Sequence, residues 1–340
     1  KQYDGKWVVL DAEDLQITHE ARDSNKWITD MKYSPNGEML AVGGFDFKIY
    51  VYSVNDAYSL SCTISQHNAY ITHLDFSEDS SWIQSNCAGF ELAFYEADTG
   101  MFIPAASRLR DVRWATQSCV LGWAMQGLWQ PQRDGTEVTA CDVNLFRNED
   151  EIVIVSGDNY GRVQMYRYPS TSSTANAKKY RPGANPITRV RFISGDSHVI
   201  SMSGVDKCIM KWRHSRDRGE DVAFDIHNRA GRMEEEDEDV IKFFGLDDHV
   251  SDGTDANDIK NMMTSRPWMA SIVEPSDVSV LDTFDEKKPP DVKLEMEHMF
   301  GLQCDTTRAS VRYNRDGDII YPSSKYVCVY NKKANAQTFY

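Results

Sequence analysis

The chain has 340 residues, of which 41% are hydrophobic and 11% aromatic, a composition typical of a globular protein rather than a disordered one. No run approaches the roughly 18 apolar residues that a membrane-spanning helix needs, so no membrane segment is predicted. The formal net charge of −15 argues against general affinity for nucleic acid or an anionic membrane, whose phosphates would repel the chain.

A leading strand is predicted from Trp7 to Asp11, ahead of a repeat that fills the first 214 residues. Four segments of the repeat align: "ITDMKYS" from Ile28, "ITHLDFS" from Ile71, "VTACDVNLF" from Val138 and "ITRVRFIS" from Ile187. Each alternates apolar and polar side chains, the pattern of a strand with one buried face. A second apolar run and a third strand that ends near an aromatic residue follow each of them. The sequence therefore predicts an all-β protein with four propeller blades.

Two of these blades carry an aspartate six residues before the closing aromatic, Asp46 before Tyr52 and Asp206 before Trp212. This spacing places the carboxylate in the tight turn between the second and third strands, where it can accept hydrogen bonds and hold the turn. A repeat of this length and pattern resembles the WD repeat of β-propellers, and His67 stands where that family has a Gly-His pair. These five residues are predicted to have structural roles within the blades.

The third repeat begins late. Val138 follows Ile71 by 67 residues, whereas Ile71 follows Ile28 by 43. The excess of about 24 residues is too short for another blade of about 40 to 45 residues. The apolar stretch from Cys119 to Thr136 is therefore predicted to be an inserted hairpin or an extended edge, whose tryptophans pack on a neighbouring blade.

The inserted stretch carries a more specific resemblance. The sequence "VRWATQSCVLGWAMQGLWQPQRDGTEVTACDVN" is similar to the corresponding segment of the echinoderm microtubule-associated protein-like (EMAP-like) family. A Trp-Thr pair, a Cys-Val-Leu-Gly-aromatic run, a Gly-hydrophobic-Trp and an Asp-Gly-Thr occur there in the same order. The resemblance covers residues 5 to about 213. Its signature residues in the predicted hairpin are Trp114, Cys119, Gly122, Trp123, Trp129, Asp134 and Gly135.

A second resemblance lies after an acidic stretch. Residues 216 to 265 contain six Lys or Arg against 15 Asp or Glu, which is typical of a solvated linker. Residues Pro289 to Tyr340 resemble the hydrophobic EMAP-like motif that opens each propeller module of the family, although "GLQC" replaces the family's Gly-Tyr-Arg-Gly-like turn. The motif residues carried over are Phe300, Gly301, Tyr313, Gly317, Tyr321, Tyr330 and Asn331. From the residues alone, the same stretch predicts strands of a propeller core around an "RDGD" turn.

These segments predict three units: the C-terminal blades of one propeller at 1–214, an acidic linker at 215–265, and the opening motif and first strands of a following propeller at 266–340. This order implies that the chain is an excerpt of a protein with tandem modules.

The sequence carries no recognisable motif for catalysis or for metal or cofactor binding. The chain has no GxSxG, GxxxxGK[ST] or HExxH motif, and its seven cysteines include no CxxC pair. The stretch Asp248 to Ile259 has the glycine of a calcium loop, but Val250 and Ile259 occupy positions that need oxygen ligands. We therefore predict a protein that is not an enzyme and has no cofactor or metal.

The family resemblance implies a microtubule-associated scaffold of the cytoplasm and cytoskeleton, with the axoneme of a cilium or flagellum as a narrower location. It implies tubulin and other cytoskeletal or axonemal proteins as partners, and no nucleic acid or membrane. Tubulin is acidic, so basic residues would have to face it. The candidate contacts are Arg108, Arg110, Arg113, Lys178, Lys179, Arg181, Lys332 and Lys333. The alternative is a WD-repeat adaptor for a non-tubulin complex, such as a ubiquitin ligase or a trafficking coat.

Overall fold

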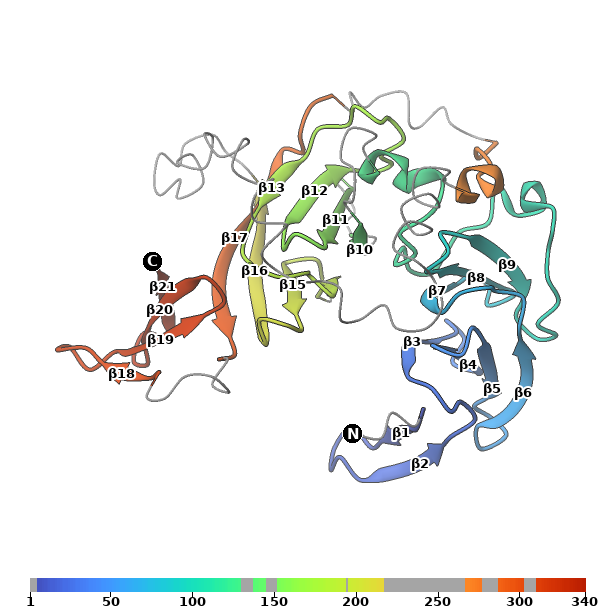
Figure 1. Cartoon of the computed structure of the whole chain (residues 1–340), viewed down its shortest axis with the longest axis horizontal. Helices are drawn as coiled ribbons and strands as arrows, with labels where there is room; N and C mark the ends of the chain where they lie inside the picture. Colours follow the sequence, from blue (N-terminus) through green and yellow to red (C-terminus); the bar gives the residue numbers. More distant parts are fainter. Residues whose placement is uncertain are drawn as a thin grey trace.

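A computed structural model of the chain describes residues 5–129, 137–144, 152–193, 195–216, 267–276, 287–302 and 310–340. Its regular structure is almost entirely antiparallel sheet, divided into small sheets that follow one another along the chain. In Figure 1 these sheets fan around a common centre, and the first strands of neighbouring repeats pack together, β3 beside β7 and β10 beside β14. This arrangement of blades confirms the predicted all-β propeller fold. No helix among the described residues is long and apolar enough to cross a lipid bilayer.

The four repeats each supply the strands of one sheet. The strands are β3 (Ile28–Tyr33), β4 (Met39–Gly44), β5 (Ile49–Ser53) and β6 (Ser59–Ile64); β7 (Ile71–Phe76), β8 (Trp82–Cys87) and β9 (Leu92–Glu96); β10 (Val138–Val143), β11 (Val153–Asp158), β12 (Val163–Arg167) and β13 (Lys178–Tyr180); and β14 (Arg189–Phe192), β15 (His198–Ser203) and β16 (Cys208–Arg216). Within each sheet, consecutive strands are hydrogen-bonded neighbours.

The Ile-Thr or Val-Thr pair that opens three of the repeats forms a β-bulge. The register between the first two strands shifts at Ile28/Asp30, Ile71/His73 and Val138/Ala140. In two of these bulges the threonine hydroxyl donates to a glycine carbonyl of the second strand, from Thr29 to Gly43 and from Thr139 to Gly157, both at 3.1 Å. Because a bulge bends a strand and increases its twist, the repeated threonine marks the bend at the start of each inner strand.

The predicted leading strand is one arm of a hairpin. β1 (Trp7–Leu10) pairs with β2 (Ile17–Ala21) as a two-stranded sheet. Asp11, the last residue of the predicted strand, instead begins the turn, where its carboxylate accepts a hydrogen bond from the Glu13 amide at 2.8 Å. Trp7 packs edge-on against Tyr52 of the first blade with ring centroids 4.9 Å apart, which fixes the hairpin to that blade.

The inserted stretch does not form the predicted hairpin within the described residues. The short 3-10 helix η2 (Trp123–Leu128) lies here, another, η1 (Ala106–Leu109), precedes the stretch, and residues 119–129 contain no strand. The reason is that several of its main-chain amides bond to buried side chains of β7 and β8 rather than to a partner strand. Asp134 and Gly135 lie outside the described residues.

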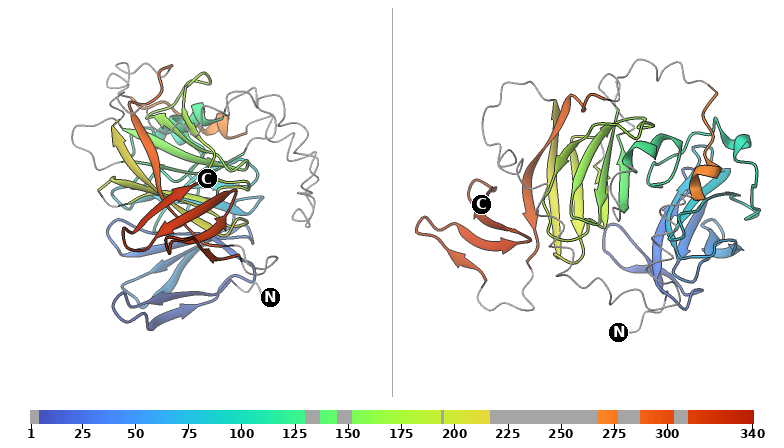
Figure 2. Two further views of the ribbon diagram at one scale, coloured as in Figure 1. Left: turned by 90° about the vertical axis from the view of Figure 1, so that its left-hand side faces the viewer. Right: turned by 45° about the horizontal axis from the view of Figure 1, so that its top comes forward.

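The last repeat takes its fourth strand from far along the sequence. β17 (Val292–Phe300) pairs with β16, and Figure 2 shows the two strands running side by side. Val292 and Leu294 are buried in one core with Trp212, and this burial favours the pairing. The predicted unit at 266–340 therefore does not begin with a sheet of its own, because its first long strand completes the preceding blade.

The remaining described elements follow or precede this strand. η5 (Pro267–Ser271) is a short 3-10 helix, and the final sheet contains β18 (Arg312–Tyr313), β19 (Ile319–Ser323), β20 (Tyr326–Asn331) and β21 (Ala336–Phe339). The predicted linker lies outside the described residues except for Ser215 and Arg216, and so does the stretch Asp248 to Ile259. The assignment of the final sheet to a following propeller stays a prediction.

Candidate functional site

Residues 114–129, called here the signature segment, lie between the sheets β7–β9 and β10–β13. Buried side chains of the segment share one core with both sheets, and they are Val120, Leu121, Met125, Leu128 and Trp129. The indole nitrogen of Trp129 donates to the Val120 carbonyl at 2.9 Å, and the ring meets Phe90 edge-on. The half-buried Trp114 stacks on Phe94 with ring centroids 5.9 Å apart. The segment thus fills the space between two blades.

A single buried carboxylate holds the main chain of the segment. Asp75 on β7 has no exposed surface. One of its oxygens accepts hydrogen bonds from the amides of Ser118 and Cys119 at 3.0 and 2.8 Å. The other accepts from the hydroxyls of Ser118 and Thr116, and Lys32 Nζ lies 3.8 Å from it. Charge-assisted bonds of this kind are stronger than neutral ones, so Asp75 determines the path of the segment.

Two further buried groups complete this attachment. The Leu121 amide donates to the side-chain oxygen of Asn86, on β8, at 3.0 Å. The thiol of Cys141 contacts the Cys119 carbonyl at 3.5 Å. Burial, together with the charge of Asp75, raises the thiol pKa of both cysteines well above the usual range, so both stay protonated. All six cysteines among the described residues are free.

Charged side chains at the third and fifth positions of the aligned repeats meet at the centre of the fan. The Arg189 guanidinium lies 3.3 Å from the Asp30 carboxylate, and this pair joins the last repeat to the first. The Arg191 guanidinium lies 3.0 Å from the carboxylate of Asp142 on β10. Asp142 also accepts a hydrogen bond from the Phe192 amide at 2.7 Å. The inner strands are therefore linked by paired charges.

Burial shifts the protonation of this central cluster. It raises the pKa of Asp30 and Asp142, and the neighbouring arginines oppose that shift. It lowers the pKa of His73 to about 3, and the charge of Arg189 adds to the effect. His73 is therefore neutral at pH 7, and Nε2 lies 3.1 Å from the Thr139 carbonyl as a donor.

The sequence analysis missed these central residues because it assigned the polar positions of the inner strands to an exposed face. The available signal was the sign of the charges at one aligned position, where the first and last repeats carry Lys32 and Arg191 and the middle two carry Asp75 and Asp142. Such complementary charges favour contact between strands rather than exposure to solvent.

Both predicted turn aspartates lie between the second and third strands of their blades. Asp46 accepts a hydrogen bond from the Tyr50 hydroxyl at 2.7 Å, and Asp206 accepts one from the Asn185 side chain at 2.5 Å. Asp158 has the same role in the third repeat, where it accepts two main-chain amides of its turn at 2.9 Å each. The longer turn "GDNYGR" hid that aspartate from the spacing argument.

The closing aromatics are buried and hydrogen-bonded. The Tyr52 hydroxyl donates to Asp23 at 2.7 Å, and the Trp212 indole nitrogen donates to the Ser201 hydroxyl at 2.8 Å. Each ring is 2% exposed, so these residues contribute both to the core and to a polar network.

His67 belongs to a small polar cluster beside the end of β8. Its Nε2 lies 2.6 Å from the Ser85 hydroxyl and its Nδ1 lies 3.5 Å from the Glu91 carboxylate. The Cys87 thiol also contacts Glu91, at 3.4 Å. His, Cys and Glu can bind zinc, and here their ligand atoms lie within 4.8 Å of one another. Burial raises the pKa of Cys87 to about 12, however, and a protonated thiol disfavours a metal.

The residues of the predicted EMAP-like motif connect the last repeat with the final sheet. Phe300 ends β17, and Gly301 follows with a φ of 107°, where a Cβ would lie 2.1 Å from the Lys207 carbonyl. The Tyr321 hydroxyl donates to the Met299 carbonyl at 2.9 Å. The other motif residues are Tyr313, exposed on β18, Gly317, in the turn before β19, and Tyr330 and Asn331, at the end of β20.

The candidate tubulin contacts lie on three separate elements. We call them the first (Arg108, Arg110, Arg113), second (Lys178, Lys179, Arg181) and third (Lys332, Lys333) basic clusters. The first occupies η1 and the chain after it, the second occupies β13 and the residue after it, and the third occupies the turn between β20 and β21. All of these side chains are exposed except Lys178, which is half-buried. The members of the second cluster already take part in intramolecular interactions.

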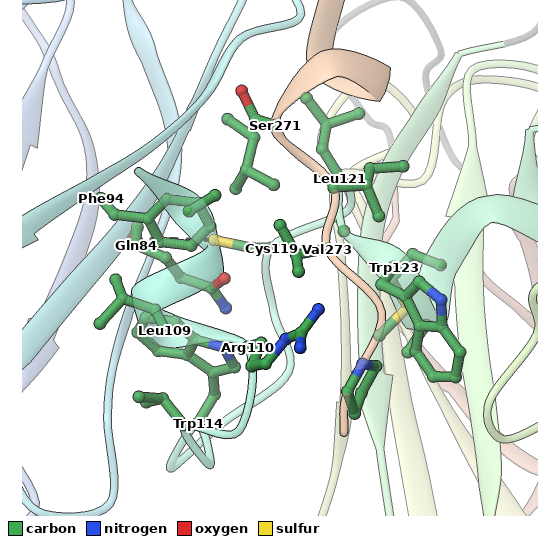
Figure 3. A pocket seen from close by; sticks show the side chains of 18 of the residues that line it. Gln84, Phe94, Leu109, Arg110, Trp114, Cys119, Leu121, Trp123, Ser271 and Val273 are labelled. Atoms are coloured by element: carbon green, nitrogen blue, oxygen red, sulfur yellow. Dashed lines mark hydrogen bonds between the residues drawn. The ribbon is translucent and has the colours of Figure 1, made fainter. Parts of the chain in front are cut away.

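A cavity of about 130 Å³ lies beside the signature segment. Its lining includes Leu109 from η1, Arg110 directly after η1 and Trp123 from η2. Figure 3 shows that Ser271 and Val273, which follow the acidic stretch in the sequence, pass across the space between these two sides. The position of Gly122 at the start of η2 leaves the cavity wall without a side chain there.

Comparison with known proteins relates this arrangement to a family. Residues 2–214 match the family model described as the echinoderm microtubule-associated protein second beta-propeller. The chain belongs to the echinoderm microtubule-associated protein-like family. The resemblance predicted from the sequence is thereby confirmed. The match ends before residues 289–340 of the EMAP-like chain, so the assignment of the hydrophobic EMAP-like motif to those residues stays a prediction.

Individual relatives are moderately similar to this EMAP-like chain. Echinoderm microtubule-associated protein-like 4 of Xenopus tropicalis is 37% identical over 215 residues, which cover 62% of the chain and 23% of that protein. Echinoderm microtubule-associated protein-like 3 of Mus musculus is 34% identical over 213 residues, which cover 62% of the chain and 23% of that protein. Echinoderm microtubule-associated protein-like 2 of Rattus norvegicus is 34% identical over 212 residues, which cover 62% of the chain and 32% of that protein. The matched part thus spans less than a third of each relative.

Proposed function

We propose that this EMAP-like chain is part of a non-catalytic scaffold that binds microtubules in the cytoskeleton. The observation that carries the proposal is the match of residues 2–214 to a propeller of microtubule-associated proteins. The signature segment lies inside that match and is fixed by Asp75 between two blades. A propeller built in this way presents rigid faces and loops to protein partners.

Electrostatics restricts which surfaces of the chain can contact the tubulin of a microtubule. The chain carries a net charge of −15, and tubulin is acidic as well, so contact requires locally basic surface. We propose the first and third basic clusters as the contacts, because their side chains are exposed and those of the second cluster already interact within the chain. Several weak contacts of this kind, repeated in tandem modules, would multiply through avidity.

The finer parts of the proposal concern the rest of the protein. We propose that residues 266–340 connect these blades to a following propeller module, and that other cytoskeletal or axonemal proteins bind the same scaffold. β17 supports a direct connection, since it completes the last repeat before the chain enters the final sheet.

Co-pelleting with taxane-stabilised microtubules tests the proposal. We expect binding that weakens with added salt and with proteolytic removal of the acidic tubulin tails. Charge reversal of Lys332 to Glu should weaken pelleting further, and the same change at Lys333 should add to the loss. The matched control is Lys48→Glu, a charge reversal on an exposed turn between β4 and β5. Absence of pelleting at low salt would contradict direct binding and favour the adaptor alternative.

A further inference from the structure

Residues 267–276 cross a groove formed by η1 and the signature segment. Trp268 is the anchor, because it is only 2% exposed and its ring centroid lies 6.3 Å from that of Trp129 within the shared core. At the other end, Ser276 donates from its amide and its hydroxyl to the two carboxylate oxygens of Asp111, at 2.7 and 2.8 Å. The segment is therefore held at both ends.

Between its ends the segment is held loosely. Among the described residues, the bond from the Ser276 amide is its only main-chain hydrogen bond to the blades. Cavities of about 130 and 260 Å³ flank the stretch from Ala270 to Val273. Both cavities are partly open to solvent, and the small side chains of Ala270 and Ser271 leave them unfilled. The groove is thus larger than its occupant.

We propose that this groove is a peptide-recognition site for partner proteins, and that residues 267–276 are an internal ligand that a partner peptide displaces. The ligand is a short peptide whose tryptophan anchor lies in a 3-10 turn, with a branched apolar side chain four residues later at the position of Ile272 and a hydroxyl residue eight residues later that donates to Asp111. Buried aromatic anchors of this kind dominate the energetics of many interfaces.

The flanking cavities define which partner peptides fit best. Bulky aliphatic side chains at the positions of Ala270 and Ser271 would fill space that the internal ligand leaves empty. A partner with such residues therefore gains contacts that the internal ligand lacks. The groove is lined mainly by apolar residues of β9, η1 and the signature segment, and it borders Arg110 of the first basic cluster. Peptide binding measured without microtubules therefore tests this site separately from the proposed tubulin contacts.

Fluorescence anisotropy with a labelled synthetic peptide PWMASIVEPS, the sequence of residues 267–276, tests this proposal on the full chain. A tethered ligand acts at an effective concentration in the millimolar range. For a peptide with a Kd of about 100 µM, the internal copy should weaken apparent binding about tenfold. We expect Trp268→Ala to bind the peptide about tenfold more tightly than the wild-type chain. Replacing the tryptophan of the peptide by alanine should weaken binding about 30-fold.

Two further variants make the result decisive. Ile272→Ala removes a half-buried contact of the internal ligand and serves if Trp268→Ala fails to fold. Met269→Ala is the matched control, because Met269 is exposed on the same segment, and it should bind like the wild type. Folded anchor variants that bind the peptide no better than the wild type would overturn the proposal. So would a Trp268→Ala dimer that the peptide cannot dissociate, because the groove would then bind a second copy.

Discussion

Replacing Asp75 by asparagine tests whether one carboxylate fixes the signature segment. The substitution keeps the shape of the side chain and removes its charge. In the wild-type chain the carboxylate accepts from two amides, two hydroxyls and the Gln84 side chain. An asparagine has one acceptor oxygen, and its amide group would face donors that it cannot satisfy. At least one donor therefore loses its partner in a site without exposed surface.

The expected loss of stability follows from these contacts. Removing one partner of a buried charge pair costs about 3–5 kcal/mol, and an unsatisfied buried amide costs about 1–3 kcal/mol. Lys32, with a side chain 14% exposed, would lose the carboxylate with which it forms an ion pair. Since these costs overlap, we expect Asp75→Asn to lower the free energy of unfolding by about 4 kcal/mol. Ser118→Ala removes one hydroxyl donor and should cost about 1 kcal/mol.

Urea unfolding followed by tryptophan fluorescence measures both losses, and hydrogen exchange locates them. In Asp75→Asn the amides of Ser118 and Cys119 should lose protection, while those of β11 keep it. A loss below about 1 kcal/mol, with both amides still protected, would refute the assignment of the segment's attachment to Asp75.

Three further predictions concern buried groups elsewhere. The pKa of His73 is lowered to about 3 in the folded chain. Below pH 6.5 the unfolded chain therefore takes up a proton that the folded chain does not, and the free energy of unfolding decreases as the pH is lowered. Between pH 7.5 and 5 this loss is about 2 kcal/mol, and denaturant titrations should show that His73→Gln abolishes it, whereas equal pH dependence in both proteins would contradict the assignment. Gly127→Ala should destabilise by about 1–3 kcal/mol in thermal unfolding, because its Cβ would lie 2.1 Å from Ser170 Oγ; an unchanged midpoint would show that the site relaxes. Trp212→Phe should cost about 1–3 kcal/mol in urea titrations, because it leaves a void and removes the bond to Ser201, and a neutral effect would argue against that network.

The blades could be predicted from the sequence because the strands that pair within a blade lie close together in the sequence. Each repeat pairs strands separated by short turns, so alternation and the positions of Asp46 and Asp206 suffice to place them. The hairpin prediction failed, over the described residues 119–129, for the opposite reason. Asp75 binds the Cys119 amide across 44 positions of sequence, and no periodic pattern encodes such a pairing.

The buried charges were missed for a related reason. Alternation identifies two faces of a strand, and the polar face was assumed to meet water. In a propeller the inner strands converge, so Asp30 and Arg189 meet each other instead. The groove at Trp268 depends on a contact between residues more than a hundred positions apart, and sequence gives no signal for it.

The late origin of β17 has a consequence during protein synthesis. The chain must add 75 residues after Arg216 before Val292, the first residue of that strand, exists. Closing a loop of this length costs about 4 kcal/mol of chain entropy, so the strand docks only once most of its contacts can form together. Until then β16 presents a nine-residue open edge, the kind of edge that templates aggregation. A nascent chain stalled before residue 292 is therefore expected to need a chaperone at this edge, although its earlier blades have already folded.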